Sequence, residues 1–186
     1  MYMRSINNVV RRLTEFSGEI RTVSQNPSLN SAKISGPSGC GKSSLIESFL
    51  SSNLDIAAKS LHLSNNFDLP CFTVGEVVST IAGVSSAIEE HLFAMELGTE
   101  FMANNYNKSL ETFSVGERQR FSLATLLSSR GVADCEYIWL DEGLSGVQPA
   151  LVSGLVEYLN AIGMGVFLVH HGLIEKHEFG WEITFK

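Results

Sequence analysis

One glycine-rich segment carries the residues needed to hold phosphate. Residues 36–43 read Gly-Pro-Ser-Gly-Cys-Gly-Lys-Ser and fit G-x-x-x-x-G-K-[ST] at every fixed position. Glycines let backbone N–H groups turn toward phosphate oxygens, and the helix expected next presents its positive end to the anion. The pattern predicts nucleoside triphosphate binding, with Lys42 on the β- and γ-phosphates and Ser43 on Mg²⁺. The expected nucleotide contacts are Gly36, Pro37, Ser38, Gly39, Cys40, Gly41, Lys42, Ser43 and Ser44.

A pair of acids follows a short apolar run later in the chain. Residues 138–140 are Ile-Trp-Leu, and Asp141 and Glu142 come next. In phosphate-loop enzymes the first acid holds Mg²⁺, and the second can polarise the attacking water. The alternative is an ordinary strand end with two solvated acids. The complete phosphate loop upstream favours Asp141 as a metal ligand and Glu142 as a catalytic residue.

The elements that must position these residues alternate between short strands and helices. We expect strands at 19–24, 31–35, 59–63, 137–140 and 166–169, and the alternation at 181–185 suggests an edge strand. Helices are expected at 42–52, about 74–97, 116–128 and 151–162, with an irregular polar stretch at 98–112. Apolar strands separated by helices predict an α/β fold with a mostly parallel central sheet.

Composition limits the class of protein. The chain has 186 residues, of which 44% are hydrophobic, so a single domain with a real core is expected. Lys and Arg number 13 against 20 Asp and Glu, giving a net charge of -7, which disfavours a DNA-gripping surface. The three cysteines, Cys40, Cys71 and Cys135, form no C-x-x-C pair, so no zinc is expected. No signal-peptide or membrane-spanning run occurs, which predicts a cytoplasmic protein without direct membrane insertion.

A third motif lies between the phosphate loop and the acid pair. Residues 113–120, Phe-Ser-Val-Gly-Glu-Arg-Gln-Arg, resemble the signature L-S-G-G-[QE]-x-Q-R of ABC-type ATPases. The resemblance implies that Ser114, Gly116 and Glu117 contact ATP held by the opposite protomer. It therefore implies an ATP-dependent homodimer, or a heterodimer with another ABC protein. Physically, the segment is a second helix N-terminus aimed at an anion.

Two further ABC positions are less regular. Val-His-His-Gly at 169–172 occupies the place of the switch histidine, whose imidazole contacts the γ-phosphate and the catalytic acid. His171 aligns best, but the doubled histidine leaves the register between His170 and His171 open. Ser64 or Asn65 falls where these proteins usually carry a glutamine, so that glutamine is missing.

The dispersed motifs most resemble the UvrA family of bacterial excinuclease proteins. Residues 38–45 are similar to its S-G-S-G-K-S-S-L, residues 72–77 to its M-T-V-x-E-A, and residues 141–149 to D-E-P-[ST]-x-G-L-H-x. Residues 97–117 resemble the run that leads into its signature, and the likeness spans about 32–172. It implies a P-loop NTPase of the ABC ATPase type, with residues 1–186 as one domain. A small helical signature subdomain is then expected at about 64–130.

The sequence departs from that family in size and at single positions. UvrA proteins have two cassettes, whereas this chain has one. They also carry a zinc module and large insertions, whereas here only 72 positions separate Lys42 from Ser114 (114 − 42). Val115 replaces the first signature glycine, and a β-branched residue resists positive φ and would crowd a phosphate. Gly143 stands in place of a proline, and Gln148 in place of a histidine or aspartate.

Three functions stay open. The first is a UvrA-like ATPase that uses ATP and Mg²⁺ to drive an unknown protein partner or a nucleic-acid process, with at most weak DNA binding. The second is the nucleotide-binding subunit of an ABC transporter, disfavoured by the missing glutamine. The third is an ATP-gated binding module with little turnover. Single-turnover hydrolysis separates the first from the third, and co-purification with a membrane protein would support the second.

Overall fold

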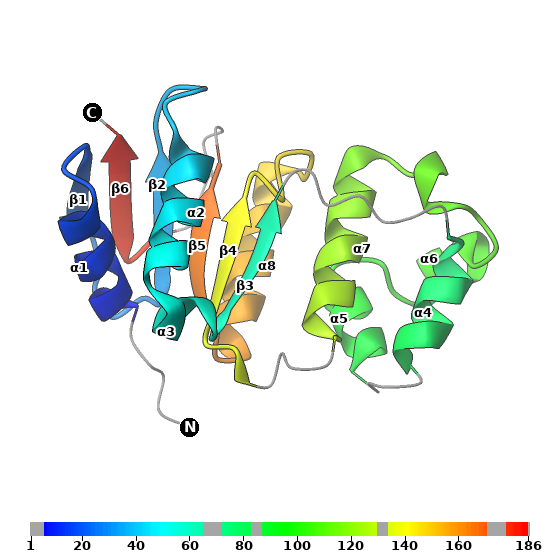
Figure 1. Ribbon diagram of the computed structural model, residues 1–186. Helices are drawn as coiled ribbons and strands as arrows, with labels where there is room; N and C mark the ends of the chain where they lie inside the picture. Colours follow the sequence, from blue (N-terminus) through cyan, green and yellow to red (C-terminus); the bar gives the residue numbers. More distant parts are fainter. Residues whose placement is uncertain (1–5, 65–71, 83–86, 130–133, 171–177, 186) are drawn as a thin grey trace.

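The computed structural model describes residues 6–64, 72–82, 87–129, 134–170 and 178–185 and shows one six-stranded sheet. The strand order is β1-β6-β2-β5-β4-β3 (Figure 1). β1 is antiparallel to β6, and every other neighbouring pair is parallel. The strands are β1 (Ile20–Ser24), β2 (Ser31–Ser35), β3 (Ser60–Ser64), β4 (Tyr137–Asp141), β5 (Gly165–Val169) and β6 (Trp181–Phe185).

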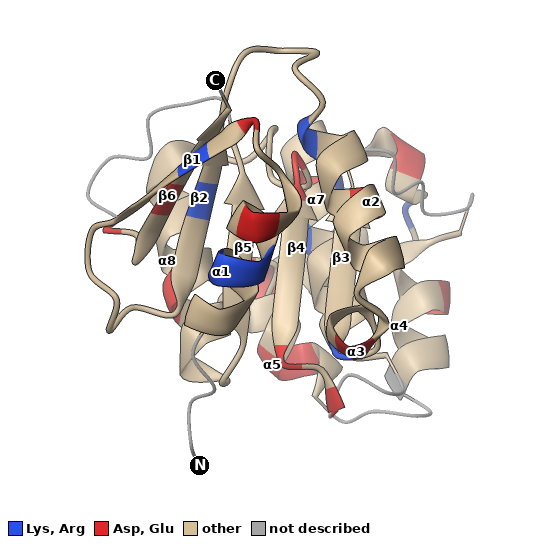
Figure 2. Ribbon diagram, turned by 60° about the vertical axis from the view of Figure 1, so that its left-hand side comes forward, with Lys and Arg blue, Asp and Glu red and all other residues tan. Residues whose placement is uncertain are grey.

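Helices cover both faces of this sheet. α1 (Asn7–Phe16), α2 (Lys42–Ser52) and α3 (Leu54–Ala57) lie on one face, and α8 (Pro149–Ala161) lies on the other (Figures 1 and 2). The remaining helices gather beyond β3, namely α4 (Val74–Ala82), α5 (Ile88–Ala94), α6 (Thr99–Asn105) and α7 (Val115–Leu127), together with a short 3₁₀ turn at Leu110–Thr112. None of the helices in the described ranges is long and apolar enough to span a bilayer.

The central strands are apolar throughout because both of their faces are covered. Ile138 and Leu140 of β4 pack into the core that includes α7 and α8. Trp139, one residue away, packs into the opposite core with α1 and α2. Its ring stacks on Phe167 of β5 with 3.9 Å between ring centroids and an interplanar angle of 9°. Strand side chains alternate between faces, so an unbroken apolar run is what a doubly covered parallel strand requires.

The sequence predictions for the strands and the main helices are confirmed within a few residues, with three exceptions. β6 was expected at an edge but lies between β1 and β2, and β1 is the edge strand. The stretch 98–112, expected to be irregular, contains α6, on which no residue is fully buried. The helical region at 74–97 comprises two helices, α4 and α5.

The helices α1 and α3 were not predicted from the sequence either. α1 buries Val9, Val10 and Leu13, with Ile6 just before it, against the sheet. Those residues recur at helical spacing, so the signal was present in the sequence. The helix matters to the fold because it completes the layer that also contains α2.

Phe167→Ala should lower the free energy of unfolding by about 3–5 kcal/mol, because it removes the ring stacked on Trp139 and leaves a cavity in a fully buried site. Urea unfolding followed by tryptophan fluorescence measures this change. Phe93→Ala is the matched control: its ring is 76% exposed, so stability should change by no more than about 0.5 kcal/mol. Equal losses in the two variants would contradict the described core.

Candidate functional site

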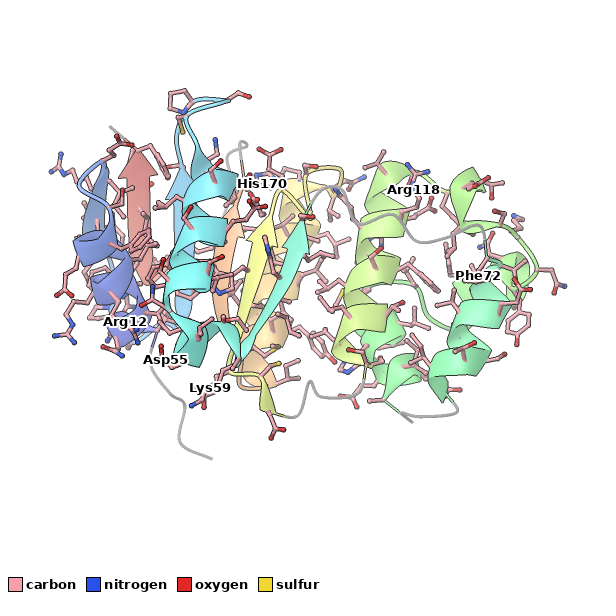
Figure 3. The ribbon with its side chains drawn as sticks, in the orientation of Figure 1. Arg12, Asp55, Lys59, Phe72, Arg118 and His170 are labelled. Atoms are coloured by element: carbon pink, nitrogen blue, oxygen red, sulfur yellow. The ribbon has the colours of Figure 1, made fainter. Side chains whose placement is uncertain are left out.

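The sheet topology brings the phosphate loop, the acid pair and His170 to one edge of the sheet, the edge formed by the carboxyl ends of its parallel strands. β2, β5, β4 and β3 run parallel, so their carboxyl ends share an edge, and β5 lies between β2 and β4. Ile34 pairs with Val169, which in turn pairs with Asp141. The phosphate loop therefore begins two strands, about 10 Å, from Asp141. Figure 3 shows His170 at the same edge. In open α/β sheets, ligands bind outside the carboxyl ends of the strands.

The phosphate loop connects β2 to α2 through a backbone that only glycine adopts readily. Gly39 and Gly41 have φ of 75° and 92°, and Gly41 is the N-cap of α2. A Cβ on Gly36 would lie 2.9 Å from the Cβ of Phe185, too close for a side chain. These glycines are therefore required by the turn itself, which aims the helix N-terminus out of the sheet edge.

Lys42 lies inside this loop and is only 5% exposed. Its ammonium donates hydrogen bonds to the carbonyl oxygens of Pro37 at 2.8 Å and Gly36 at 3.1 Å. A buried cation must be compensated, and here the loop's own carbonyls do so. The lysine is thus held beside the loop backbone that is predicted to bind phosphate. Ser43 and Ser44 are exposed at the start of α2.

Asp141 ends β4 with its side chain buried. Its Oδ1 is inaccessible to solvent and accepts no hydrogen bond from the residues that the structure describes. A buried carboxylate oxygen is costly unless a cation or an ordered water satisfies it. Carboxylate and hydroxyl oxygens are the donors that Mg²⁺ prefers, so Asp141 and Ser43 fit such an ion chemically.

Glu142 is held in an uncommon backbone conformation. Its φ is 56°, and among the described residues only Glu96 is another non-glycine with positive φ. Its N–H donates to the Val169 carbonyl at 3.3 Å, and its carbonyl accepts from the Ser145 N–H at 3.0 Å. Conformations of this kind persist where surrounding contacts impose them, and they concentrate at functional sites.

The structure around Gly143 accounts for the glycine that stands in place of the proline of the UvrA pattern. Gly143 is buried, and a Cβ there would lie 2.9 Å from the Leu63 carbonyl oxygen. The chain after Glu142 therefore passes so close to β3 that the proline usual at this position would not fit without a shift.

The signature segment forms the start of α7. Ser114 is the N-cap, and its hydroxyl accepts a hydrogen bond from the Glu117 N–H at 3.3 Å. The Glu117 carboxylate in turn accepts from the Ser114 hydroxyl at 2.7 Å and from its N–H at 2.9 Å. This is a complete capping box. In this structure Glu117 organises the helix end, and Ser114 is exposed beside it.

Val115 does not create the backbone problem that the sequence suggested. It is the first residue of α7 and does not have positive φ. Its side chain is 49% exposed. A Cβ on Gly146 would lie 2.8 Å from Val115 Cγ1, so the valine packs directly over the 145–147 turn. Gly116 is constrained as well, because a Cβ there would overlap the Gly146 carbonyl oxygen.

One polar residue of the site was missed by the sequence interpretation. Gln119 is buried on α7, and its Nε2 donates to the Glu142 carbonyl at 3.3 Å and to Ser145 Oγ at 3.1 Å. Its Oε1 accepts from the Gly146 N–H at 2.8 Å. It shares the buried helix face with Gly116 and Leu123, and a polar residue at such spacing is a usable signal.

The remaining predicted positions divide between described and undescribed parts of the chain. His170 is buried directly after β5. His171, the preferred switch histidine, and Asn65 lie outside the described residues. The structure therefore places the phosphate loop, Asp141, Glu142 and His170 along one edge, with the signature segment on α7 beyond β3.

Comparison with solved structures identifies the fold. A bacterial Atm1-family ABC exporter with ATP bound aligns with 85% of the chain at 15% identity and a TM-score of 0.67. CbiO1 of Clostridium perfringens, part of the ABC transporter complex cbiONQ, aligns with 77% at 18% identity and 0.55. RNase-L inhibitor aligns with 84% at 17% identity and 0.54. The fold is thus that of ABC-type ATPase domains, the P-loop NTPase fold with a mostly parallel sheet.

The chain corresponds to part of these proteins. It spans 32% of the exporter chain, 38% of RNase-L inhibitor and 68% of CbiO1. No protein-family model and no curated protein matches the sequence.

The capping box makes a pH-dependent contribution to stability. Hydrogen bonds from the Ser114 side chain and then its backbone hold the pKa of Glu117 below its ordinary value of 4.5. A depressed folded-state pKa means that the stabilisation is fully present above about pH 4.5 and is lost as pH falls through the folded-state pKa. Glu117→Gln should cost about 0.5–1 kcal/mol at pH 7, in the range for a helix cap.

Thermal melts at pH 7 and pH 3.5 test this. The Tm difference between the parent and Glu117→Gln should shrink at the lower pH. Glu47→Gln, at an exposed position on α2, serves as control and should show little difference at either pH. A Glu117→Gln difference that is independent of pH would show that the charge of Glu117 does not stabilise α7.

Proposed function

We propose that this chain is a UvrA-like ABC ATPase that binds Mg-ATP through residues 36–44 and hydrolyses it with Glu142. The observation that carries the proposal is the shared sheet edge, where a lysine held by loop carbonyls, a buried unsatisfied Asp141 oxygen and a conformationally fixed glutamate occur together. The ABC ATPase fold supports it. The UvrA assignment rests on the sequence runs at 38–45, 72–77, 97–117 and 141–149.

The roles follow from the position of each group. Lys42 would exchange its loop carbonyls for the β- and γ-phosphates, and the N–H groups of the loop and of α2 would bind the same anion. Ser43 and Asp141 would hold Mg²⁺, which offsets charge on the phosphates. Glu142 would accept a proton from a water molecule while the water oxygen forms a bond to the γ-phosphorus. The bond between the γ-phosphorus and the β,γ-bridging oxygen breaks in the same reaction. The products are ADP and inorganic phosphate, and His171 would contact the γ-phosphate.

The second half of each site would come from another protomer. Within one chain the signature end of α7 lies on the far side of β3 from the phosphate loop. We infer a two-fold head-to-tail pair, in which Ser114, Gly116 and Glu117 close on ATP held by Lys42 of the other protomer. A second ABC protein could replace the second copy. Residues 64–130 would then act as the helical signature subdomain within a single domain spanning 1–186.

Direct DNA binding is proposed to be weak. Residues 60–107 contain six acidic residues and neither Lys nor Arg, and acidic positions mark α4 and α5 in Figure 2. Acidic side chains on these helices repel phosphate. Fluorescence anisotropy with a 20-base-pair duplex should show weak binding that falls steeply with salt. Tight binding to damaged duplex at physiological salt would contradict this and favour a repair role.

Lys42→Ala should weaken Mg-ATP binding by at least about tenfold, because it removes the charge that pairs with the β- and γ-phosphates. Isothermal titration calorimetry measures the Kd. Lys59→Ala is the matched control, since Lys59 pairs with Glu136 at the opposite end of β3 and should leave ATP affinity unchanged. Parent-like affinity of Lys42→Ala would exclude residues 36–44 as the nucleotide site.

Glu142→Gln should lower the ATP hydrolysis rate by about 100-fold or more, in the range for a lost general base, while leaving ATP binding intact. Phosphate release under single-turnover conditions measures the rate, with Glu47→Gln as a surface control that should match the parent. A parent-like rate in Glu142→Gln would remove Glu142 from the catalytic role. A parent that binds ATP without hydrolysing it would make the chain an ATP-gated binding module.

A further inference from the structure

The carboxamide of Gln119 joins the signature helix to the backbone on both sides of Gly143. Its nitrogen contacts the Glu142 carbonyl at 3.3 Å and Ser145 Oγ at 3.1 Å, and its oxygen accepts the Gly146 N–H at 2.8 Å. Gln119 is buried, whereas Ser145 and Gly146 are exposed, so its three hydrogen bonds lie at the boundary between the protein interior and solvent. A single side chain of α7 therefore holds both the first and the last residue of the 142–146 segment.

The segment it holds contains the residue with the uncommon conformation. Glu142 has φ of 56°, a region that costs a non-glycine residue energy and requires external contacts. The Gln119 amide is one of those contacts, together with the Val169 carbonyl and the Ser145 N–H. Because φ and ψ of Glu142 set the direction of its Cα–Cβ bond, a shift of Gln119 would displace the base of that side chain and with it the carboxylate.

The start of α7 is also closely packed against this segment. Neither Gly116 nor Gly146 could accept a Cβ, because the first would overlap the Gly146 carbonyl and the second would meet Val115. Ser114 and Gln119 are five residues apart, about 7.5 Å along the helix. A displacement at the exposed end of α7 must therefore move the 145–147 turn, since a close-packed contact transmits strain.

We propose that Gln119 is a positioning residue that couples the two ATP sites of the dimer, which rests on the function proposed above. In that arrangement Ser114 contacts ATP held by the other protomer, whereas Glu142 acts on ATP held by its own Lys42. Gln119 lies between them in one chain. Closure of α7 on one nucleotide is then transmitted through Gln119 to the catalytic carboxylate facing the second nucleotide.

Gln119→Met tests the coupling, because methionine has similar length and no amide. Steady-state ATPase assays of the full chain should show kcat lowered about tenfold and a Hill coefficient reduced toward 1. The Kd for ATP should stay within about twofold, since the phosphate loop is untouched. Thr125→Val, which removes an intrahelical hydrogen bond six residues further along α7, is the matched control and should retain kcat and cooperativity.

A double-mutant cycle sharpens the assignment. Ser145→Ala removes one contact of the same amide, so its effect on kcat should be much smaller in the Gln119→Met background than in the parent. Additive effects, or a Gln119→Met variant with parent-like kcat and Hill coefficient, would overturn the proposal.

Amide hydrogen exchange makes the contact testable apart from hydrolysis. Exchange at Gly146 should be at least about tenfold faster in Gln119→Met than in the parent, and unchanged in Thr125→Val, because the Gly146 N–H loses its acceptor. Unchanged exchange in Gln119→Met would overturn the positioning role. A parent that hydrolyses no ATP would refute the proposed function and with it the coupling of ATP sites, while the exchange measurement would still decide whether Gln119 holds this segment.

Discussion

The close contact between β4 and β5 is the constraint on which the rest of the molecule depends. Trp139 and Phe167 stack on one face, and Ile138, Leu140, Val166 and Leu168 fill the other, so the two strands are fixed from both sides. The carboxyl ends of these strands carry Asp141, Glu142 and His170. Because β5 also pairs with β2, the same contact sets the distance from these residues to the phosphate loop. Core packing thus determines the geometry of the edge.

At that edge the fold holds several groups in environments or backbone conformations that are uncommon for them. Lys42 is buried with loop carbonyls around its charge, Asp141 keeps a buried oxygen without a partner among the described residues, and Glu142 has positive φ. The buried Asp141 oxygen and the positive φ of Glu142 cost free energy in the protein alone, whereas the loop carbonyls offset the buried charge of Lys42. Each arrangement would be relieved or used when a triphosphate and a divalent cation bind, which is the usual relation between strain and function.

Sequence alone predicted what depends on local pattern. The phosphate loop, the doubly buried strands 137–140 and 166–169, and the helix at 42–52 follow from glycine placement and apolar runs, and the structure has them within a residue or two. The position of β6 could not be read this way, because alternation reports burial on one face and does not name the neighbouring strands. α6 was missed because none of its residues is fully buried, so its apolar stripe is weak.

The candidate site shows the same division. Residues 36–44, Asp141 and Glu142 were recognised by type and spacing. The contacts of Gln119 with residues 142–146 were not, because they join segments that only the fold brings together. The expected backbone conflict at Val115 was wrong for a related reason, because a residue that begins a helix needs no positive φ. That its side chain would crowd a phosphate stays a prediction.

The proposed function requires that ATP is bound between two chains, and sedimentation velocity tests this requirement most directly. The Glu142→Gln protein is measured at about 50 µM, with and without Mg-ATP. This concentration exceeds the Kd of about 10 µM that corresponds to a dimerisation free energy of about -7 kcal/mol. We expect a monomer without nucleotide and a dimer with Mg-ATP. A monomer under both conditions would contradict closure of this chain on a second copy of itself.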